Sequence, residues 1–385
     1  MTETSAREPI IVLGGGPIGL AAALLLARAG HAVTVVDGRP PAAAQADRRL
    51  LALSRGTWQA LAPLLAAPPL HAAIERVRVS SAGEFGGTRI DANEIDGAAG
   101  APLGMTVFYG ELQRALEAAV VQQPGITLRR PARAGAVLQR PQEVSVTLED
   151  AGVLTAAMLI HAEGAPDPGP RAEPAWALLA DVQLAGTPPG DAFERFTREG
   201  PLALLPAPAA VRPAWSLVWC AGEAAVARRA ALSDADFMAE LQAAAGATAR
   251  VHAAHARQVV RLTPSLRERV HEHRAVWLGN AAQTLHPVAG QGFNLGLRDV
   301  LTLVTTLAQA RRGDALDVPA ALATYAERRR ADRRVIGTVT RWLPPVFATP
   351  LWPVAAARSL GLTALDLLPP LRRQWARLLM FGVRD

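Results

Sequence analysis

The sequence predicts an α/β fold with an inserted antiparallel sheet and a helical C-terminus. Three observations support this fold class. A strand, a glycine-rich loop, a helix and a second strand follow one another between residues 9 and 36. The order of strand, glycine-rich loop and helix returns between residues 275 and 310. Short strands separated by turn residues fill residues 176 to 220, which is typical of an antiparallel sheet.

The size and composition of the chain exclude several classes of site. Its 385 residues exceed one usual hydrophobic core, so we expect more than one lobe. All 40 basic residues are arginines, and a chain without lysine holds neither a Schiff-base lysine nor a P-loop lysine. Cys220 is the only cysteine, which excludes an internal disulfide, a redox-active cysteine pair and a cysteine-rich zinc site.

The uncharged run from Ile10 to Ala27 raises the question of a membrane span. The segment Gly14–Pro17 interrupts this run near its start, and the acidic Glu8 precedes it. A signal peptide would instead have a basic lead and a small-residue cleavage site. We therefore expect a cytoplasmic protein.

The N-terminal glycine-rich loop fits a dinucleotide-binding motif. The β-branched strand Pro9–Leu13 leads into the loop, and Gly14, Gly16 and Gly19 fit G-x-G-x-x-G. The first glycine allows a tight turn, the second a close approach to a pyrophosphate, and the third close packing of helix on strand. Asp37 follows the next strand, and its carboxylate can accept hydrogen bonds from ribose hydroxyls. The motif by itself leaves FAD and NAD open.

Periodicity and turn residues predict the other elements up to residue 161. The predicted helices are Leu20–Ala29, a segment around Thr57–Leu65, and Tyr109–Gln122. The predicted strands are His31–Val36, Ile126–Leu128, Glu143–Leu148 and Ala156–His161. Arg49 lies in a basic stretch before the second helix, where its side chain either reaches a cofactor or stays in solvent.

Four short strands with turns between them predict the inserted antiparallel sheet. They are Trp176–Leu184, Asp191–Thr197, Pro201–Pro206 and Ala214–Cys220. A helix is predicted after them, over Asp234–Ala245.

A second glycine-rich loop follows the short strand Ala275–Leu278. Gly290, Gly292 and Gly296 lie close together in it, and a helix is predicted over Val300–Ala310. Glycines let backbone approach a ligand closely, and a helix start offers unpaired N–H groups and a positive dipole end. This late loop therefore suits an electron-rich, partly anionic group.

In order and spacing, these pieces resemble the class A flavin monooxygenases. That family has an N-terminal G-x-G-x-x-G, a central acidic-Gly motif and a late G-Q-G-x-N-x-G-x-x-D, which residues 290–299 match. Within it, the chain resembles the ubiquinone-biosynthesis hydroxylases, and most of all the 2-octaprenyl-6-methoxyphenol hydroxylases. The stretches that carry this narrower resemblance are Phe193–Thr197 with Gly200–Ala203, Ser216–Cys220 and Gly279–Asp299.

The resemblance implies a Rossmann-like FAD-binding domain of the para-hydroxybenzoate hydroxylase type. Its expected parts are residues 1–70, 105–170 and 273–340. Substrate-domain strands are expected in residues 71–104, and the antiparallel-sheet substrate domain in residues 171–272. Residues 341–385 are expected to form a helical C-terminal segment.

The resemblance also gives roles to single residues. Pro287 and Gly290 are expected where flavin and phenol meet, as the catalytic face, and Asn280 is expected to hold the ribityl chain. The N-terminal loop would hold the adenine-dinucleotide end and the late loop the isoalloxazine end, which favours FAD over NAD as the bound cofactor. The expected cofactor-binding residues are Gly14, Gly16, Pro17, Ile18, Gly19, Asp37, Arg49, Gln113, Gly279, Asn280, Gly290, Gln291, Gly292, Phe293 and Asn294.

The chain departs from the family pattern at three positions. Asn280 and Gln283 replace an Asp and a His of the late motif, and Glu163 replaces the Asp of the central motif. The segment after Gly164 lacks the expected serine and is rich in Pro and Gly. This divergence bears on NAD(P)H use, because the central motif serves cofactor and nicotinamide handling in the family. His286 is expected to be structural, and the other histidines form no metal-ligand constellation, so no metal site is expected.

The chemistry implied by the resemblance is aromatic hydroxylation. NADH or NADPH reduces FAD, and dioxygen then gives a flavin C4a-hydroperoxide that attacks an electron-rich phenol. The expected substrate is a lipophilic polyprenyl methoxyphenol of ubiquinone biosynthesis, with O2 as co-substrate. Two alternatives stay open. One is another ring position or another phenol, and the other is an inactive flavin-binding partner of the ubiquinone-synthesis complex, whose members are expected partners in either case.

The C-terminal tail is basic and amphipathic over Leu371–Phe381. It can lie peripherally on the anionic inner face of the bacterial plasma membrane, or pack on the FAD-binding domain with its arginines in water. No basic patch with interleaved aromatic residues points to nucleic acid.

Overall fold

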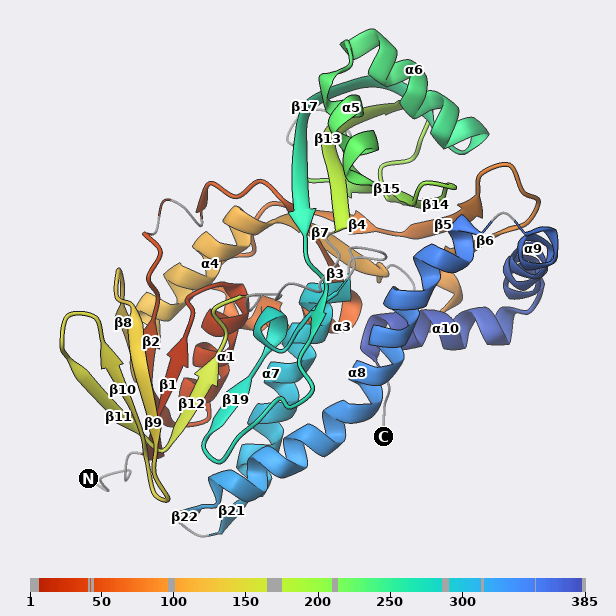
Figure 1. Ribbon diagram of the computed structural model, residues 1–385. Coiled ribbons are helices and arrows are strands. Elements are labelled where there is room, and N and C mark those ends of the chain that lie inside the picture. The colour runs from red at the N-terminus through yellow and green to blue at the C-terminus, as the bar shows by residue number, and fades with distance from the viewer. Residues whose placement is uncertain are drawn as a thin grey trace.

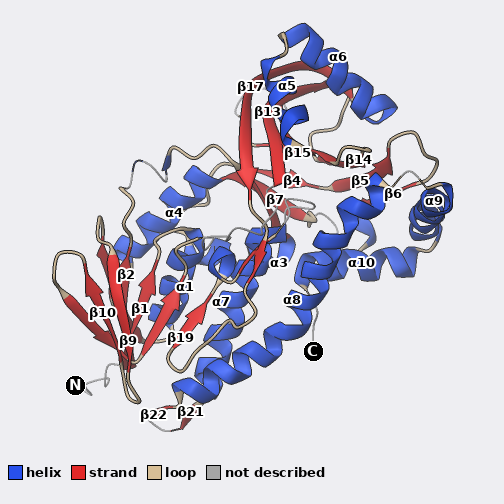
Figure 2. Ribbon diagram, viewed as in Figure 1, coloured by secondary structure: helices blue, strands red, loops and turns tan. Residues whose placement is uncertain are grey.

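A computed structural model describes residues 7–40, 42, 45–95, 101–164, 175–209, 214–285, 291–312, 315–349 and 351–382. Two sheet-containing lobes are joined by a small sheet, and long helices run along one side of both (Figures 1 and 2). The predicted α/β architecture with an inserted sheet and a helical C-terminus is confirmed.

The first lobe is built on a five-stranded parallel sheet in the order β19-β12-β1-β2-β8. Its strands are β1 (Arg7–Leu13), β2 (His31–Val36), β8 (Ile126–Arg129), β12 (Met158–His161) and β19 (Ala275–Trp277). The helices α1 (Pro17–Arg28), α4 (Tyr109–Gln122) and α7 (Gln291–Gln309) belong to this lobe. A three-stranded antiparallel sheet made of β9 (Ala134–Gln139), β10 (Val144–Leu148) and β11 (Val153–Ala156) contributes to the core on the other face.

The apolar run of β1 is buried on both sides of the parallel sheet. Ile10 and Val12 pack into the core that includes α1, α4 and α7, while Ile11 and Leu13 pack against the three-stranded sheet. A strand covered on both faces has no solvent side, which is why its sequence is continuously apolar rather than alternating.

One predicted strand is confirmed over Met158–His161 but begins two residues too early. The run Ala156–His161 is not a single strand. Strand β11 ends at Ala156 in the three-stranded sheet of the first lobe, and β12 begins at Met158 in the parallel sheet. The N–H of Ala157, between them, donates to the carbonyl of Pro9. The apolar sequence is continuous there, and only the tertiary pairing shows that the chain changes sheet.

The second lobe is a seven-stranded sheet in the order β17-β13-β16-β15-β14-β5-β6. Its strands are β5 (Arg76–Ser81), β6 (Gly87–Asp91), β13 (Ala175–Ala185), β14 (Asp191–Phe196), β15 (Pro201–Ala207), β16 (Ala214–Ala221) and β17 (Arg250–Leu262). All neighbours are antiparallel except β5 and β14, which pair in parallel. The helices α5 (Glu223–Ala231) and α6 (Asp234–Ala245) lie on one face (Figure 1).

A three-stranded sheet connects the lobes. It consists of β3 (Leu50–Ser54), β7 (Gly104–Phe108) and β4 (His71–Ile74), and α3 (Arg55–Leu61) follows β3. The segment 71–104 therefore gives β4 to this sheet and β5 and β6 to the seven-stranded sheet. Short strands complete the fold: β18 (Ser265–Leu266), β20 (Gln283–Thr284), β21 (Arg311–Arg312) and β22 (Ala315–Leu316). Single turns of 3-10 helix are η1 (Ala62–Leu64), η2 (Ala92–Glu94), η3 (Gly246–Thr248) and η4 (Gly279–Ala281).

Three helices end the chain: α8 (Val318–Ala348), α9 (Trp352–Leu367) and α10 (Pro369–Phe381). Helix α8 runs along the first lobe toward the edge of the second, where α9 lies beside β6 (Figure 1). Helix α10 packs on α3, and Ser54 Oγ donates to the carbonyl of Met380 at 2.8 Å. Within the described residues, no helix combines the length and apolar character needed to cross a bilayer.

Candidate active site

The N-terminal loop is shaped by glycines that leave no room for side chains. Gly14 has φ +99°, and a Cβ there would overlap the backbone of Ala162. A Cβ at Gly19 would overlap the carbonyl oxygen of Gly14, so the third glycine of the motif is needed for packing. Gly16 is the N-cap of α1 and supplies no side-chain cap, which leaves the first N–H groups of the helix available to a ligand.

Two of the predicted cofactor-binding residues support this loop. Asp37 is buried at the end of β2, and a Cβ on Gly15 would lie 2.8 Å from its Oδ2. Asp37 accepts a hydrogen bond from the N–H of Arg39 at 3.1 Å. Gln113, fully buried on α4, donates through Nε2 to the carbonyl of Gly15 at 2.7 Å. Their direct contact with a cofactor stays a prediction.

The described parts of the late loop, residues 279–285 and the start of α7, lie directly against the N-terminal loop. Gly279 has φ +58°, and a Cβ there would lie 3.2 Å from Cγ2 of Ile18. A Cβ at Gly296 would lie 2.9 Å from Cα of Gly279 and 3.1 Å from Cδ1 of Ile18. Two glycines therefore form a notch that receives Ile18, and the two loops predicted to hold one ligand are neighbours.

Asn294 ties the start of α7 to β3. Its Oδ1 accepts from the N–H of Ser54 at 2.9 Å, and its Nδ2 donates to the carbonyl of Ala52 at 3.0 Å. The side chain is buried, so these bonds fix the end of β3 beside the late loop.

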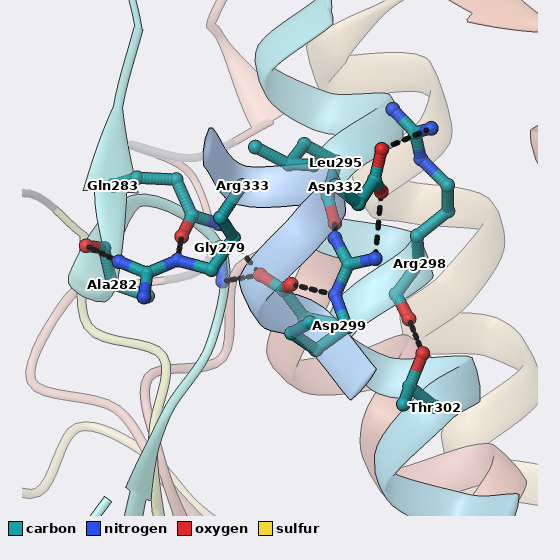
Figure 3. Close-up of polar contacts among 10 residues, drawn as sticks. Gly279, Ala282, Gln283, Leu295, Arg298, Asp299, Thr302, Asp332 and Arg333 are labelled. Carbon is teal, nitrogen blue, oxygen red and sulfur yellow. Dashed lines mark hydrogen bonds and ion pairs between the residues drawn. The ribbon is translucent and has the colours of Figure 1, made fainter. Parts of the chain in front are cut away.

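A buried ionic network centred on Asp299 of α7 links the start of the late loop to helix α8 (Figure 3). Asp299 has no exposed surface and accepts from the N–H of Gly279 at 3.1 Å and from Nε2 of Gln283 at 2.6 Å. It also accepts from Nε of Arg329 on α8 at 2.7 Å. Burial lowers the pKa of Arg329, but the carboxylates of Asp299 and Asp332 outweigh burial and raise it.

Gln283, which stands where the family has a His, is a member of this network. Its Nε2 donates to Asp299, and its Oε1 accepts from Nε of Arg333 at 2.7 Å (Figure 3). An amide both donates and accepts without charge, so it links a carboxylate to a guanidinium. This departure from the family pattern therefore preserves a satisfied buried network.

A cavity of about 800 Å³ opens between the two loops, the seven-stranded sheet and the C-terminal helices. Its polar end is lined by the N-terminal loop, the late loop, Arg39, Arg49 and Tyr109. Its apolar end lies between the sheet and the last two helices. The residues there include Val77, Val79, Ile90, Ala192, Phe196, Leu205, Val218, Leu362, Leu365, Trp375, Leu379 and Met380.

The predicted site residues divide into three groups. Those that line the cavity are Gly16, Pro17, Ile18, Arg49, Asn280, Gln291, Gly292, Phe293 and Asn294. Those that support its walls are Gly14, Gly19, Asp37, Gln113 and Gly279. Pro287 and Gly290, and with them His286, lie outside the described residues, so their predicted roles stay predictions.

The divergent central motif also reaches the cavity. Ala162, Glu163 and Gly164 line it beside the N-terminal loop. The Glu163 carboxylate lies 2.9 Å from Nδ1 of His161, whose ring stacks on Trp277 at 4.8 Å between centroids. Glu163 is therefore held at the end of β12 by its own strand, and residues 165–174 lie outside the described range.

Sequence reasoning assigned no role to Ser54, Asp299 or Glu194. The partners of Ser54 and Asp299 lie far away along the chain, in α7, α10 and α8. Glu194 lines the cavity from β14. One signal was available: it is the only acidic residue at the alternating positions 192, 194 and 196, which otherwise carry Ala and Phe.

The residues present fit FAD. The glycine positions leave backbone bare along the cavity wall, and the uncapped start of α1 offers N–H groups to a pyrophosphate. Arg39 and Arg49 bring guanidinium groups to the same end, where they pair with Asp37 and Asp47. The cavity volume is in the upper part of the range typical of cofactor and drug-sized ligands.

Known proteins resemble this chain over most of its length. Residues 177–338 match the family model described as FAD binding domain. The chain is 31% identical over 395 residues to ubiquinone hydroxylase UbiL of Rhodospirillum rubrum, covering 96% of this chain and 88% of that protein. The chain belongs to the ubiquinone-biosynthesis hydroxylases, within the class A flavin monooxygenases. Escherichia coli 3-demethoxyubiquinol 3-hydroxylase is also 31% identical, over 408 residues that cover 96% of this chain and 98% of that protein.

Solved structures show the same fold. Pseudomonas aeruginosa PqsL in complex with 2-aminobenzoylacetate superposes with a TM-score of 0.73 at 20% identity, over 92% of this chain and 99% of that chain. Pseudomonas putida p-nitrophenol 4-monooxygenase PnpA superposes with a TM-score of 0.73 at 15% identity, over 98% and 99% of the two chains. As a member of the ubiquinone-biosynthesis hydroxylases, the chain is an FAD-dependent monooxygenase, with NAD(P)H as the electron donor typical of the class.

Proposed function

We propose that this hydroxylase acts on a polyprenyl methoxyphenol during ubiquinone biosynthesis, using FAD, NAD(P)H and O2. The observation that carries the proposal is one continuous cavity, which is polar at the two glycine loops and apolar between the sheet and helices α9 and α10. A ring placed where these two parts meet would leave a prenyl chain along Leu365, Leu379 and Met380.

FAD, once reduced, supplies the activated oxygen, and the chain's own residues supply position and electrostatics. The N–H groups at the start of α1 and the arginines Arg39 and Arg49 would hold the pyrophosphate end. The N–H groups at the start of α7, near Gly292, would stabilise negative charge on the ring system. Pro287 and Gly290 are proposed to complete the face where the ring meets the substrate.

A lipid substrate also gives a purpose to the outer side of the C-terminal helices. Trp352, Leu360, Leu367 and Leu368 are each more than half exposed, and Leu371 is 46% exposed. We propose that these residues touch the membrane surface from which the substrate enters, because helices α9 and α10 also form the cavity wall on their inner side. Peripheral contact of this kind needs no membrane span.

The function is tested with purified protein and a methoxyphenol that carries a short prenyl chain. The visible spectrum should show bound flavin, and NAD(P)H oxidation should be stimulated by the phenol and should consume O2 with formation of a hydroxylated product. Bound flavin with no phenol-stimulated turnover would favour an inactive partner role. A protein that cannot be loaded with FAD would contradict the whole assignment.

A further inference from the structure

A row of directly paired residues crosses the cavity side of the seven-stranded sheet. Thr88 pairs with Val79, and Val79 pairs with Glu194. On the other side, Glu194 pairs with Ala203, which pairs with Val218. All five line the cavity, as expected for paired residues that project from one face.

Glu194 is the ionisable residue of this row. Ala192 and Phe196, two positions away on the same strand, also line the cavity and are apolar. Arg195 lies between them in sequence and projects from the opposite face, where it donates to Ser80 Oγ at 3.0 Å and to the carbonyl of Ala244 at 2.8 Å. The register of β14 therefore directs the side chain of Glu194 into the cavity and that of Arg195 away from it.

The fold leaves the Glu194 carboxyl without a partner. Its side chain is half-buried because it faces the cavity, yet Oε1 is buried and makes no hydrogen bond to any described residue. Burial raises the pKa of this carboxyl to about 7. Buried polar atoms in proteins are nearly always hydrogen-bonded, so an acid that the fold does not satisfy points to a ligand.

Two other titratable or charged side chains of the described residues bear on this part of the cavity. Burial, together with the charge of Glu194, raises the pKa of the Cys220 thiol to about 12, so the thiol stays neutral. Arg358 on α9 lines the cavity but pairs with Glu84 and donates to the carbonyl of Thr349 at 3.0 Å. The Arg358 charge is therefore already balanced by Glu84. Glu163 also lines the cavity but pairs with His161, whereas Oε1 of Glu194 makes no hydrogen bond to any described residue.

We propose that Glu194 binds the phenol hydroxyl of the substrate and takes its proton during hydroxylation. The inference rests on the proposed function and assigns a residue to the same cavity. In this step the phenol O–H bond breaks and an O–H bond forms on the carboxylate, and no electrons change hands. The phenolate that results is richer in electrons than the phenol, so its ring attacks electrophilic oxygen more readily. The proton passes to solvent when the product leaves.

The test compares two probes on the FAD-loaded protein without NAD(P)H. One is the methoxyphenol with a short prenyl chain, and the other is its O-methyl ether, which has the same ring but no phenol proton. Calorimetry at about pH 5.5 and about pH 8.5 brackets the Glu194 titration. The wild-type protein should prefer the phenol by about tenfold or more at the higher pH only, since a hydrogen bond to a charged group is stronger than one to a neutral group.

Glu194→Gln should abolish this preference and its pH dependence, and should lower kcat/KM for hydroxylation by about 10²- to 10⁴-fold. Glu194→Asp, which keeps the acid, should restore part of both. Glu223→Gln changes an exposed acid at the start of α5, away from the cavity, and should behave as wild type. Retention of the phenol preference and its pH dependence by Glu194→Gln would overturn the proposal.

The two arms separate this proposal from the proposed function. A wild-type protein that hydroxylates the phenol but binds the ether equally well would overturn the role of Glu194 and leave the function standing. Selective phenol binding without hydroxylation would support Glu194 as the phenol site and contradict the function. Failure to bind either probe would contradict both.

Discussion

The Glu194 carboxyl, which we propose takes part in the reaction, also lowers the stability of the folded protein at neutral pH. Burial raises its pKa from the ordinary 4.5 to about 7, so the unfolded chain loses this proton at a lower pH than the folded chain does. The part of the free energy of unfolding that depends on this carboxyl is therefore highest below pH 4.5 and falls as the pH rises toward 7. An apolar residue, such as its neighbours Ala192 and Phe196, would carry no such cost.

We predict that Glu194→Gln stabilises the folded protein at high pH only. Near pH 8 the free energy of unfolding should rise by about 1–3 kcal/mol. One pKa unit corresponds to about 1.4 kcal/mol, and solvent in the cavity screens the carboxylate and reduces this energy. Near pH 5 the change should fall to about 0.5 kcal/mol or less. Urea unfolding of both proteins at the two pH values measures the difference.

Glu240→Gln is the matched control with the opposite sign. A hydrogen bond from Arg228 is the main influence that lowers the pKa of Glu240, so its ionised form stabilises the folded state. Its replacement should therefore destabilise the protein at pH 8, and the loss should shrink as the pH falls through the lowered pKa. An equal effect of Glu194→Gln at both pH values would contradict the raised pKa of Glu194.

The sequence could place Glu194 on a strand but could not show its isolation. Alternation along residues 191–196 predicts that the side chains of Ala192, Glu194 and Phe196 share a face. What surrounds that face depends on the parallel pairing of β14 with β5, which lies more than a hundred residues earlier in the chain. A carboxyl without a partner is a property of that pairing and of the helices across the cavity, so no local pattern reveals it.

At the scale of elements, two glycines of the late loop look alike in the sequence and differ in their surroundings. A Cβ at Gly296 would press on Cα of Gly279 and on Ile18, whereas a Cβ at Gly292 would meet nothing within 4 Å. Gly296 is therefore required by the packing of α7 against the two loops. Among the described residues none gives Gly292 such a packing reason, and we attribute its small size to a ligand.

We predict opposite outcomes for alanine at these two positions. Gly296→Ala should lower the free energy of unfolding by about 1–3 kcal/mol, because the neighbours in contact must move. Gly292→Ala should leave the FAD-free protein within about 0.5 kcal/mol of wild type, while FAD binding weakens by about tenfold or more. Urea unfolding without FAD and titration of FAD fluorescence measure the two effects. Unchanged FAD affinity in Gly292→Ala would show that the loop does not approach the cofactor closely.

Whole elements followed from local pattern where the pattern was long and periodic. The helices Tyr109–Gln122 and Asp234–Ala245 were predicted with the bounds that the structure shows. The start of the predicted strand Ala156–His161 was misplaced by two residues, because an apolar stretch does not reveal a change of sheet. Helix α1 begins at Pro17, inside the glycine motif, since a proline is favourable in the first turn where its missing N–H has no partner to lose.

At the scale of the molecule, the cavity is assembled from segments that are far apart in the chain. Its walls combine the N-terminal loop, β5, β14, the late loop and the last two helices. Residue types and spacing predicted the cofactor end, because glycine motifs are local. The apolar end could not be predicted in the same way, since it depends on where α10 packs. Ala376 and Met380 are buried there, and Arg372 pairs with Glu94.

The tail therefore has an inner and an outer side, and the outer side gives a prediction for the whole molecule. Trp352, Leu360 and Leu367 are about two helical turns apart on α9, which places them on one side of the helix, and they are 79%, 61% and 71% exposed. Replacing all three by serine should lower binding to vesicles of anionic phospholipid by about tenfold or more, because each apolar side chain contributes on the order of 1 kcal/mol on entering the interface. Flotation of the FAD-loaded protein with such vesicles measures this.

Deleting the tail would be a poorer test, because it would also remove the inner wall of the cavity. The matched control replaces Leu138 and Val153, which are 53% and 62% exposed on the small sheet of the first lobe, by serine. Equal flotation of the α9 variant and this control would show that helix α9 does not touch the membrane, and the prenyl chain would then have to reach the cavity from another side.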